Sequence, residues 1–383
     1  MNKKVLLCSN ILWTITQFRL GLIKALVDAG YEVVCVADTD DFSVLSETKI
    51  ADAGARFIRL AMNRKGTNPF SDLNYLFKLK KIIKLEKPVI VINYTIKPVI
   101  YGSISARLLR IPSLAVTTGL GFVFNSNNLL TRITRLLYKF SLRFPSKVFF
   151  LNIDDREIFL QNRIIPNEKA SLLPSEGIDT DFYQPISTSP KDRDFTFLLI
   201  ARLLWEKGVG EYVEAARILR SDETINAQFM LIGYIDSDNP GGISKTQIQQ
   251  WSDEGIIEYR GTTEDIRNII SESDCVVLPS YYREGVPRTL LEAASMAKPI
   301  ITTNNVGCRE VIDDGINGFI CKTKDSTNLS EVMKKMIRLT PEGRKKMGQS
   351  GRNKILNQFD ERIVINIYLK EIEQAVNICS NNV

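Results

Sequence analysis

Short runs rich in β-branched and aromatic residues alternate along this chain with longer amphipathic stretches. Near the N-terminus, strand-like runs at Val5–Ser9 and Glu32–Ala37 enclose a helical pattern, Phe18–Ala29, which Gly30 ends. Each such strand returns to its sheet through a crossover helix, so neighbouring strands are parallel. Further strand-like runs lie at Val89–Asn93, Ser113–Thr117 and Val148–Asn152. The alternation therefore predicts an α/β fold built on parallel sheets.

A polar stretch from Ile186 to Asp194, which contains Pro190, interrupts this pattern and predicts a domain boundary. A second series of strand-like runs follows it: Phe195–Ala201, Gln228–Gly233, Ile257–Tyr259, Cys275–Pro279, Pro299–Thr302 and Gly318–Cys321. A length of 383 residues suits two domains rather than one. We expect a first domain of residues 1–186 and a second of 187–360, with a C-terminal helix, 361–383, returning to the first.

The chain contains no histidine, which excludes a histidine general base, a histidine-containing triad and a histidine-ligated metal. Its six cysteines form no CxxC pair, which favours a reducing compartment. No apolar run reaches the roughly 20 residues that span a bilayer, and the apolar stretch at the N-terminus is too short for a signal peptide. We therefore expect a cytoplasmic protein whose chemistry uses carboxylates, lysine, arginine, hydroxyls and backbone dipoles.

Two glutamates mark the most informative segment, Ser280–Ala293. It follows a strand-like run, and Pro287 opens a helical pattern that places Glu284 just before the helix and Glu292 within it. Gly285 allows close approach of the backbone, and the N–H groups of a helix N-terminus suit a diphosphate. Two carboxylates so placed can accept hydrogen bonds from sugar and ribose hydroxyls. From the spacing alone, a capped helix with two solvated glutamates is an equal alternative.

Two cations lie in another loop that follows a strand. Arg202 and Lys207 flank the turn between the run that ends at Ala201 and a helical pattern that begins near Gly208. Cations at the carboxyl end of a strand suit a diphosphate, whose charge must be neutralised before it can leave. Taken alone, an arginine and a lysine in such a loop more often belong to a solvent-exposed surface without a ligand.

Together the two segments resemble the donor-binding half of glycosyltransferase family 4, a retaining family with the GT-B fold of two facing Rossmann-like domains. The resemblance rests on the Arg202–Gly208 loop and on the Glu-x7-Glu spacing of Glu284 and Glu292. Other family-like features follow in the same order along the chain: Ser175–Asp179, Leu231–Gly233, Gly261, Asp265, Leu278–Ser280, Gly307, Glu310, Gly315 and Gly318.

The resemblance implies roles for these residues. Arg202 and Lys207 would bind the donor diphosphate and Glu284 would face the donor sugar, which makes these three the candidate catalytic residues. Glu292 would bind the ribose. The remaining donor-binding candidates are Gly285, Val286, Pro287, Arg288, Thr289 and Leu290. Retention in this fold is ascribed to front-face attack in which the departing phosphate takes the acceptor proton. The resemblance thus implies no metal, no protein nucleophile and no cofactor beyond the nucleotide-sugar co-substrate.

The first half departs from the family pattern. Many relatives carry a histidine near the reacting carbon, where this chain has Thr118, and the frequent N-terminal Gly-Gly is absent. We take four residues as candidates for the acceptor side of the site: Asn10, Arg19, Thr118 and Gly119. Asp-x-Asp triplets, which would hold a metal in another transferase fold, occur at Asp38–Asp40, Asp179–Asp181 and Asp236–Asp238, but their scatter through turn-rich segments indicates chance.

Basic residues gather in two stretches of the first half. Residues 129–147 hold five basic residues and no acidic one, with cations and apolar residues on separate helical stripes, and residues 77–87 form a second basic patch. This pattern is typical of a helix that lies in an anionic membrane surface. A packed helix with a solvated basic face is the alternative. Nucleic acid is disfavoured, because no recognition motif or aromatic interleaving accompanies the charge.

The stretches Phe18–Arg19, Val116–Phe124 and Ala201–Val209 look most like bacterial transferases that extend undecaprenyl-diphosphate-linked sugars in O-antigen, capsule or protein-glycan assembly. This resemblance implies a hexosyltransferase that uses a UDP-sugar, with N-acetylgalactosamine or another N-acetylhexosamine as the best match, and a lipid-linked saccharide acceptor. It further implies a peripheral place on the inner face of the cytoplasmic membrane. Two alternatives are a nucleotide-sugar epimerase of the same fold and a non-catalytic nucleotide-sugar-binding subunit.

Overall fold

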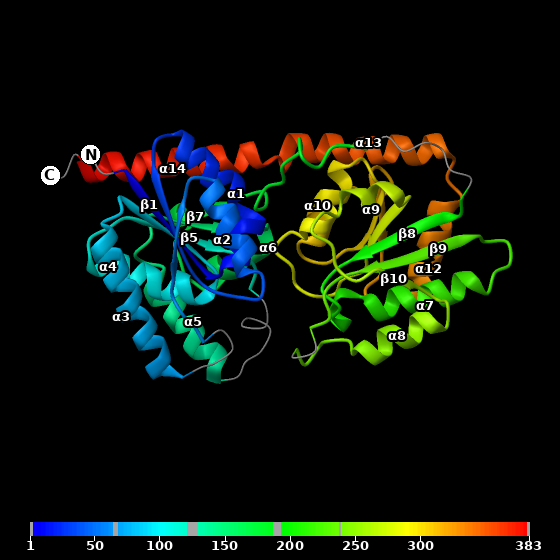
Figure 1. Cartoon of the computed structure of the whole chain (residues 1–383), viewed down its shortest axis with the longest axis horizontal. Coiled ribbons are helices and arrows are strands. Elements are labelled where there is room, and N and C mark those ends of the chain that lie inside the picture. The colour runs from blue at the N-terminus through cyan, green and yellow to red at the C-terminus, as the bar shows by residue number, and fades with distance from the viewer. Residues whose placement is uncertain (1–2, 64–67, 121–128, 187–192, 237–238, 381–383) are drawn as a thin grey trace. The chain divides into compact units, whose positions relative to one another are not determined.

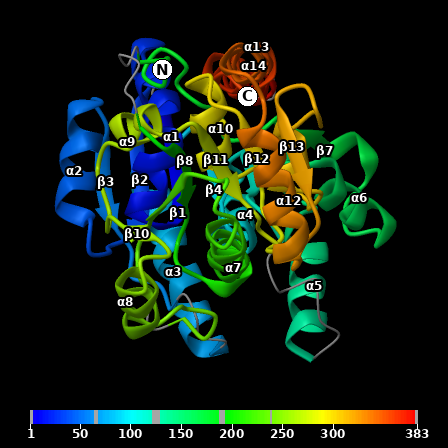
Figure 2. The ribbon, with the colours of Figure 1, turned by 90° about the vertical axis from the view of Figure 1, so that its right-hand side faces the viewer.

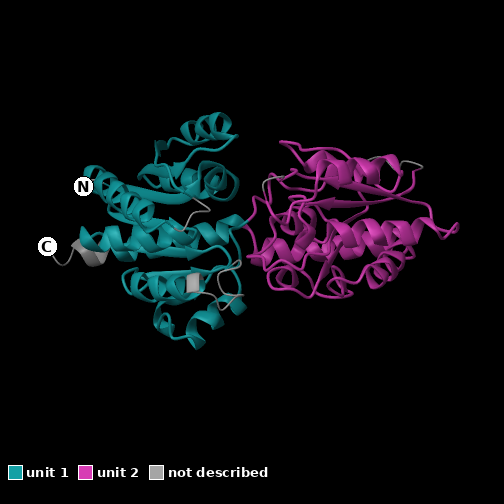
Figure 3. Cartoon of the chain, turned by 90° about the horizontal axis from the view of Figure 1, so that it is seen from below, with its two compact units in different colours: residues 1–177, 361–383 teal, residues 178–360 magenta. Residues whose placement is uncertain are grey.

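The computed structural model describes residues 3–63, 68–120, 129–186, 193–236 and 239–380 (Figure 1). The chain forms two compact units, coloured separately in Figure 3. Unit 1 comprises Met1–Gly177 and Glu361–Val383, and unit 2 comprises Ile178–Asp360. The predicted α/β class is confirmed. The boundary lies between Gly177 and Ile178 rather than after residue 186, because Ile178 and Tyr183 already pack into a hydrophobic cluster of unit 2.

The sheet of unit 1 has the strand order β3-β2-β1-β4-β5-β6-β7, and its strands pair in parallel. The strands are β1 (Lys4–Ile11), β2 (Glu32–Asp38), β3 (Arg56–Arg59), β4 (Ile90–Tyr94), β5 (Ser113–Thr117), β6 (Lys147–Phe150) and β7 (Ala170–Leu172). The helices are α1 (Leu12–Asp28), α2 (Ser43–Asp52), α3 (Pro69–Glu86), the π-turn η1 (Pro98–Gly102), α4 (Ser103–Leu108), α5 (Leu129–Ser141), α6 (Ile153–Gln161), η3 (Asn167–Lys169) and α14 (Glu361–Ser380). The order reverses direction between β1 and β4, so this pair is the topological switch point of the sheet.

The sheet of unit 2 has the order β10-β9-β8-β11-β12-β13, again with parallel pairing. The strands are β8 (Phe195–Ile200), β9 (Ala227–Ile232), β10 (Glu258–Tyr259), β11 (Cys275–Leu278), β12 (Ile300–Thr303) and β13 (Gly318–Cys321). The helices are η4 (Trp205–Lys207), α7 (Val209–Arg220), α8 (Lys245–Asp253), α9 (Arg267–Glu272), α10 (Arg288–Ser295), α11 (Cys308–Val311), α12 (Ser326–Ile337) and α13 (Pro341–Gln358). Here the switch point lies between β8 and β11.

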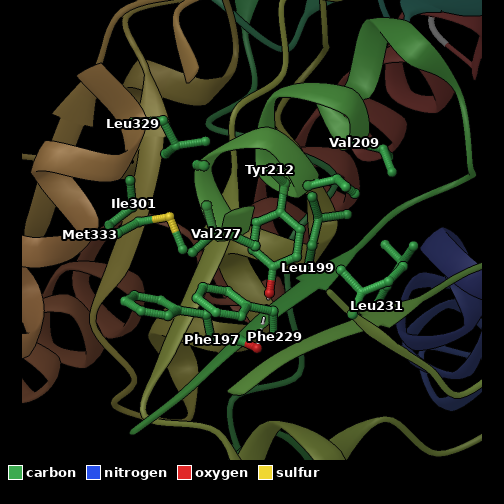
Figure 4. Packing of buried hydrophobic residues seen from close by; sticks show 14 of the residues in the cluster. Phe197, Leu199, Val209, Tyr212, Phe229, Leu231, Val277, Ile301, Leu329 and Met333 are labelled. Carbon is green, nitrogen blue, oxygen red and sulfur yellow. Dashed lines mark hydrogen bonds between the residues drawn. The ribbon is translucent and has the colours of Figure 1, made fainter. Parts of the chain in front are cut away.

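Both faces of each sheet are covered by helices, which explains why the central strands are apolar throughout. In unit 2, Tyr212 of α7 packs against Phe197 and Phe229 on one face of the sheet, as Figure 4 shows. Its buried hydroxyl lies 3.1 Å from the carbonyl oxygens of Phe197 and of Met230. A buried hydroxyl that finds such a partner avoids the cost of desolvation, so this tyrosine joins α7 to β8 and β9.

The C-terminal helix belongs to the core of unit 1. Val364, Tyr368 and Ile372 of α14 are buried in the same hydrophobic cluster as residues of β1, β2 and β4. The ring of Tyr368 lies 6.4 Å from that of Tyr94 at the end of β4. The predicted return of the terminal helix to the first domain is therefore confirmed.

Candidate active site

The carboxyl ends of β8 and β11 lie side by side at the switch point of unit 2, where open α/β sheets bind ligands. Arg202 and Lys207 follow β8, and the segment from Ser280 to Pro287 follows β11. Parallel pairing thus brings together two loops that lie far apart in sequence. Arg202, Lys207 and Glu284 lie in these two loops. Glu292 lies on α10, the helix that follows the second loop.

Lys207 and Glu284 form an ion pair across the two loops: Nζ of Lys207 donates a hydrogen bond to Oε1 of Glu284. Both side chains are nearly buried, with 13% and 11% of their surface exposed. The hydroxyl of Ser280 also donates to Oε1 of Glu284, at 3.1 Å, and Nζ of Lys207 lies 5.4 Å from the centroid of the Tyr282 ring. Each charge therefore has a fixed position before any ligand binds.

Backbone contacts hold the Lys207 loop against the end of β11. The backbone N–H groups of Tyr281 and Tyr282 both donate to the carbonyl oxygen of Glu206, at 3.0 Å each. Gly208 has a φ of 78°, and a Cβ there would lie 2.3 Å from the carbonyl oxygen of Pro279. Only glycine satisfies both this close approach and the left-handed backbone.

The Glu284 loop rests in turn on the loop that follows β12. The backbone N–H of Glu284 donates to the carbonyl of Val306 at 3.3 Å, and the side-chain amide of Asn305 donates to the carbonyl of Tyr282 at 2.6 Å. Gly307 has a φ of 83°, and a Cβ there would lie 2.3 Å from the carbonyl oxygen of Gly285. Sequence reasoning missed the supporting roles of Ser280, Tyr282 and Asn305, since only their positions after strands marked them.

Glu292 lies on α10 and is 7% exposed. Nε of Arg288 donates to its carboxylate at 2.9 Å, and the Tyr183 hydroxyl is a second hydrogen-bond partner. Burial raises the pKa of the Glu292 carboxyl, while the charge of Arg288 and these hydrogen bonds act against the rise. Arg288 thus anchors Glu292, a role that the sequence did not indicate.

The other residues of this segment differ in how much they can offer a ligand. Pro287 is the N-cap of α10 rather than its first helical residue. Leu290 is a correction to the donor-binding set, because its side chain is fully buried in the core of unit 2 and its N–H donates to the carbonyl of Pro287 at 3.2 Å. Gly285, Val286 and Thr289 are partly exposed.

Arg202 is the most accessible of the charged candidates, with 53% of its side chain exposed. Its Nη1 atom lies 3.6 Å from Oδ2 of Asp236, in the segment after β9. At that distance and exposure the pair is weak. The guanidinium is therefore available to a diphosphate at the same strand ends as Lys207.

The acceptor-side candidates separate into two groups. Asn10 lies at the end of β1, and Thr118 and Gly119 directly follow β5, so these three are at the carboxyl edge of the sheet of unit 1. Arg19 is a correction, because it lies inside unit 1 with only 3% of its side chain exposed. It is paired with Glu176, and its guanidinium stacks on Tyr94 at 4.1 Å. With so little of its side chain exposed, Arg19 joins α1 to the segment that holds Glu176 and leaves little accessible surface to an acceptor.

Among the described residues, no three cysteine, aspartate or glutamate side chains lie together in a way that could hold a metal ion. Of the Asp-x-Asp triplets, Asp38 accepts a hydrogen bond from the backbone N–H of Met62 at 3.0 Å, and Asp179 accepts one from that of Phe182 at 2.8 Å. The second bond is of the kind that shapes a turn, and the first joins the end of β2 to the segment that follows β3. Asp238 of the third triplet is outside the described residues.

Two family models match this chain, one in each unit. The model described as glycosyl transferase 4-like matches residues 4–152, and the model of glycosyl transferases group 1 matches residues 182–354. The second match contains Arg202, Lys207, Glu284 and Glu292. The division between the two matches agrees with the division into two units.

Individual relatives resemble the chain over most of its length. It is 30% identical over 381 residues to the N,N'-diacetylbacillosaminyl-diphospho-undecaprenol alpha-1,3-N-acetylgalactosaminyltransferase of Campylobacter jejuni, covering 95% of this chain and 96% of the relative. It is 28% identical over 304 residues to the UDP-Gal:alpha-D-GlcNAc-diphosphoundecaprenol alpha-1,3-galactosyltransferase of Escherichia coli, covering 76% of each.

Solved structures share the fold. A glycosyltransferase from Rickettsia africae superposes with a TM-score of 0.77 at 19% identity, over 98% of this chain and 99% of the other. HepE of Anabaena in complex with UDP superposes with a TM-score of 0.76 at 17% identity, over 97% and 100%. These likenesses confirm the GT-B fold. The chain belongs to the glycosyltransferases, with a glycosyltransferase 4-like first unit and a group 1 second unit, and it is a hexosyltransferase.

Proposed function

We propose that this enzyme transfers an N-acetylhexosamine, with N-acetylgalactosamine as the first choice, from a UDP-sugar to a lipid-diphosphate-linked saccharide in bacterial surface-glycan or protein-glycan assembly. Transfer retains the anomeric configuration and requires no metal. The observation that carries the proposal is the meeting of Arg202, Lys207 and Glu284 at the switch point of unit 2, with Glu292 on the adjoining helix. The likeness to the Campylobacter N-acetylgalactosaminyltransferase supports the choice of sugar and acceptor.

The chemistry follows from where the charges lie. The acceptor hydroxyl oxygen forms a bond to the anomeric carbon as the bond from that carbon to the diphosphate breaks, and the departing phosphate oxygen takes the acceptor proton. Negative charge grows on the leaving diphosphate, and the fixed cation of Lys207 with the accessible Arg202 stabilises it. Glu284 accepts hydrogen bonds from hydroxyls of the sugar, and Glu292 from those of the ribose.

The test is an assay of the purified protein with a panel of UDP- and GDP-sugars and farnesyl diphosphates that carry N,N'-diacetylbacillosamine or N-acetylglucosamine. The reactions contain a chelator, and products are identified by mass. We expect one added sugar from UDP-N-acetylgalactosamine, dependent on both substrates and lost in Glu284→Ala. Isomerisation of a UDP-sugar without acceptor would instead identify an epimerase, and failure to bind any nucleotide sugar would contradict catalysis.

Two helices of unit 1 support a peripheral place on the inner face of the cytoplasmic membrane. On α5, Leu136 and Phe140 are 67% and 51% exposed, and Arg132 and Lys139 are exposed with them. On α3, large apolar side chains and lysines are also exposed: Phe70, Leu73, Phe77, Leu85, Lys78, Lys81 and Lys84. Both helices contact η1 and extend from the same end of unit 1 (Figures 1 and 2). None of the described helices is long and apolar enough to span a bilayer. Exposed apolar residues beside cations suit an anionic membrane surface.

Charge reversal on α5 tests this membrane surface. The double variant Arg132→Glu/Lys139→Glu should bind vesicles of mixed phosphatidylglycerol and phosphatidylethanolamine at least about 30-fold more weakly, since each of the two lost cations contributes about 1 kcal/mol near an anionic membrane and the added carboxylates are repelled by it. Vesicle co-sedimentation measures the change. Lys345→Glu/Lys346→Glu, the same reversal at exposed positions of α13, is the control and should bind normally. An equal loss in both double variants would contradict a surface on α5.

The affinity for donor should depend on pH through Glu292. Its raised pKa means that the carboxylate takes up a proton above the ordinary value of 4.5 as pH falls, and a protonated carboxyl accepts hydroxyl hydrogen bonds less well. We therefore expect UDP-N-acetylgalactosamine to bind more weakly as pH drops from neutral through that raised pKa. Glu292→Gln should bind about tenfold more weakly at neutral pH and lose this dependence. Calorimetric titration measures both, with Glu342→Gln on α13 as control. If the donor affinity of Glu292→Gln changed with pH in parallel with that of the wild type, the assignment of Glu292 to donor binding would be contradicted.

A further inference from the structure

A group of neutral polar side chains lies at the switch point of unit 1, between β1 and β4. The parallel register pairs Cys8 with Asn93, so Asn10 and Thr95 both lie just beyond the last paired residues of these two strands. On the other side of β4 the register pairs Tyr94 with Val116, the last pair before Thr95. Open α/β sheets bind ligands at this place, and the switch point of unit 2 already holds the proposed donor residues.

Asn10 presents its amide donor in a fixed orientation. Its side-chain oxygen accepts hydrogen bonds from the N–H of Ile11 at 2.9 Å and from the hydroxyl of Ser9 at 3.3 Å. These contacts hold the amide plane, and within the described ranges Nδ2 donates to no residue. Its two N–H groups are therefore preorganised for an acceptor atom of a ligand.

Asn93 and Thr95 at the end of β4 hold polar atoms that unit 1 leaves unsatisfied. Neither the amide of Asn93, which is 0% exposed, nor the buried hydroxyl of Thr95 has a hydrogen-bond partner among the described residues. Asn93 abuts the π-turn η1, where a Cβ on Gly102 would lie 1.9 Å from its side-chain oxygen. Unsatisfied buried polar groups are costly, and π-turns often occur at functional sites.

Thr95 is also held in a strained backbone conformation. Its φ of 67° is left-handed, a region that β-branched residues rarely adopt. Glycine would fit this backbone without strain. A residue that is both strained and unsatisfied, at a place where sheets bind ligands, points to a function that the fold alone does not require.

Two cations lie in the segments that follow β1 and β4, and each is paired with a carboxylate. Arg19 is paired with Glu176, and Nζ of Lys97 donates to Asp72 at 2.6 Å and to the carbonyl of Asn63 at 2.7 Å. Asn10, Asn93 and Thr95 offer only amides and hydroxyls. Such a set matches the hydroxyl and acetamido groups of a sugar, whereas a diphosphate needs cations.

We propose that Asn10, Asn93 and Thr95 form the subsite for the neutral saccharide of the acceptor, and that this subsite does not bind the acceptor diphosphate. Asn10 donates to a sugar oxygen, and Thr95 and Asn93 exchange hydrogen bonds with its hydroxyl or acetamido groups. The inference rests on the proposed function, since it assumes a lipid-linked saccharide as acceptor. These three residues would then determine which sugar is extended.

The test compares three variants in transfer to N-acetylglucosaminyl- or N,N'-diacetylbacillosaminyl-diphospho-farnesol. Asn10→Asp keeps the oxygen that holds the loop but removes the amide donor, and Thr95→Gly removes the hydroxyl and the strain. Both variants should raise the KM for acceptor by about three- to tenfold, because each loses about one hydrogen bond to the sugar. The affinity for UDP, whose proposed site is in unit 2, should not change. Thr95→Ser, which keeps the hydroxyl, should stay within about twofold of the wild type.

Two further measurements separate a sugar subsite from a structural role. Thr95→Gly should melt at a higher temperature than the wild type while it binds acceptor less well, because the strain serves binding rather than folding. Direct titration with farnesyl diphosphate that lacks the sugar should give the same affinity for wild type and variants. Equal weakening for the sugar-free probe, or an unchanged affinity for the sugar-bearing one in both variants, would overturn the inference. If the wild type extends no acceptor, the proposed function fails, and the titrations still decide whether this edge binds a saccharide.

Discussion

The Lys207→Met variant should transfer sugar about 100 to 1,000 times more slowly than the wild type. Lys207 is a nearly buried cation fixed by Glu284, so it needs no rearrangement to stabilise the charge that develops on the leaving diphosphate. Removal of one such preorganised group typically costs a rate factor of about 100 to 1,000. The measurement is kcat for transfer at saturating donor and acceptor. Lys346→Met on α13 removes an exposed lysine in the same way and should leave kcat unchanged.

The pairing of Lys207 with Glu284 makes a second, sharper expectation possible. Because each residue holds the other, the double variant Lys207→Met/Glu284→Gln should lose little more activity than Lys207→Met alone. Additive losses in the double variant would show that the two side chains act independently. A Lys207→Met enzyme with wild-type kcat would contradict the role of this lysine altogether, whatever its effect on donor affinity.

The Gly307→Ala variant should have a kcat/KM about 100-fold below that of the wild type. The added methyl group would lie 2.3 Å from the carbonyl oxygen of Gly285 and 2.8 Å from Cβ of Glu284, so the loop that carries Glu284 has to move. A displacement of about 1 Å at a catalytic group can cost about 100-fold in rate. Steady-state kinetics measure this loss, and circular dichroism shows whether the fold survives.

Gly315 provides a matched control for the backbone strain. Its φ of 76° is close to the 83° of Gly307, but a Cβ at Gly315 would meet nothing within 4 Å. Gly315→Ala therefore also places an alanine at a positive φ, which costs about 1 to 2 kcal/mol of stability, without moving Glu284. We expect the control to lower the melting temperature and to keep near-normal kcat/KM. Similar kinetic losses in both variants would mean that strain rather than the position of Glu284 causes them.

The central strands were predictable because their burial on both faces leaves a continuous apolar run in the sequence. The predicted Ser113–Thr117 matches the central strand β5, and Gly318–Cys321 matches β13, an edge strand whose residues are also mostly buried. The edge strands β3 and β7 were missed, since β3 carries two exposed arginines and β7 has three residues. Helix α1 begins at Leu12, before the predicted start at Phe18. The sequence does not reveal this start, because the N-cap residue Ile11 has no side chain that can accept a capping hydrogen bond.

The amino-acid sequence by itself determined the fold class, the return of the C-terminal helix and the residue types of the donor site. These follow from local periodicity and from motifs within single loops. Only the tertiary structure decided which charged side chains form ion pairs and hydrogen bonds with one another. It pairs Lys207 with Glu284, anchors Glu292 through Arg288 and Tyr183, and buries Arg19 against Glu176. It also leaves Asn93 and Thr95 without partners among the described residues. The physical reason is that most of these outcomes depend on residues far apart along the chain, which only parallel strand pairing brings together.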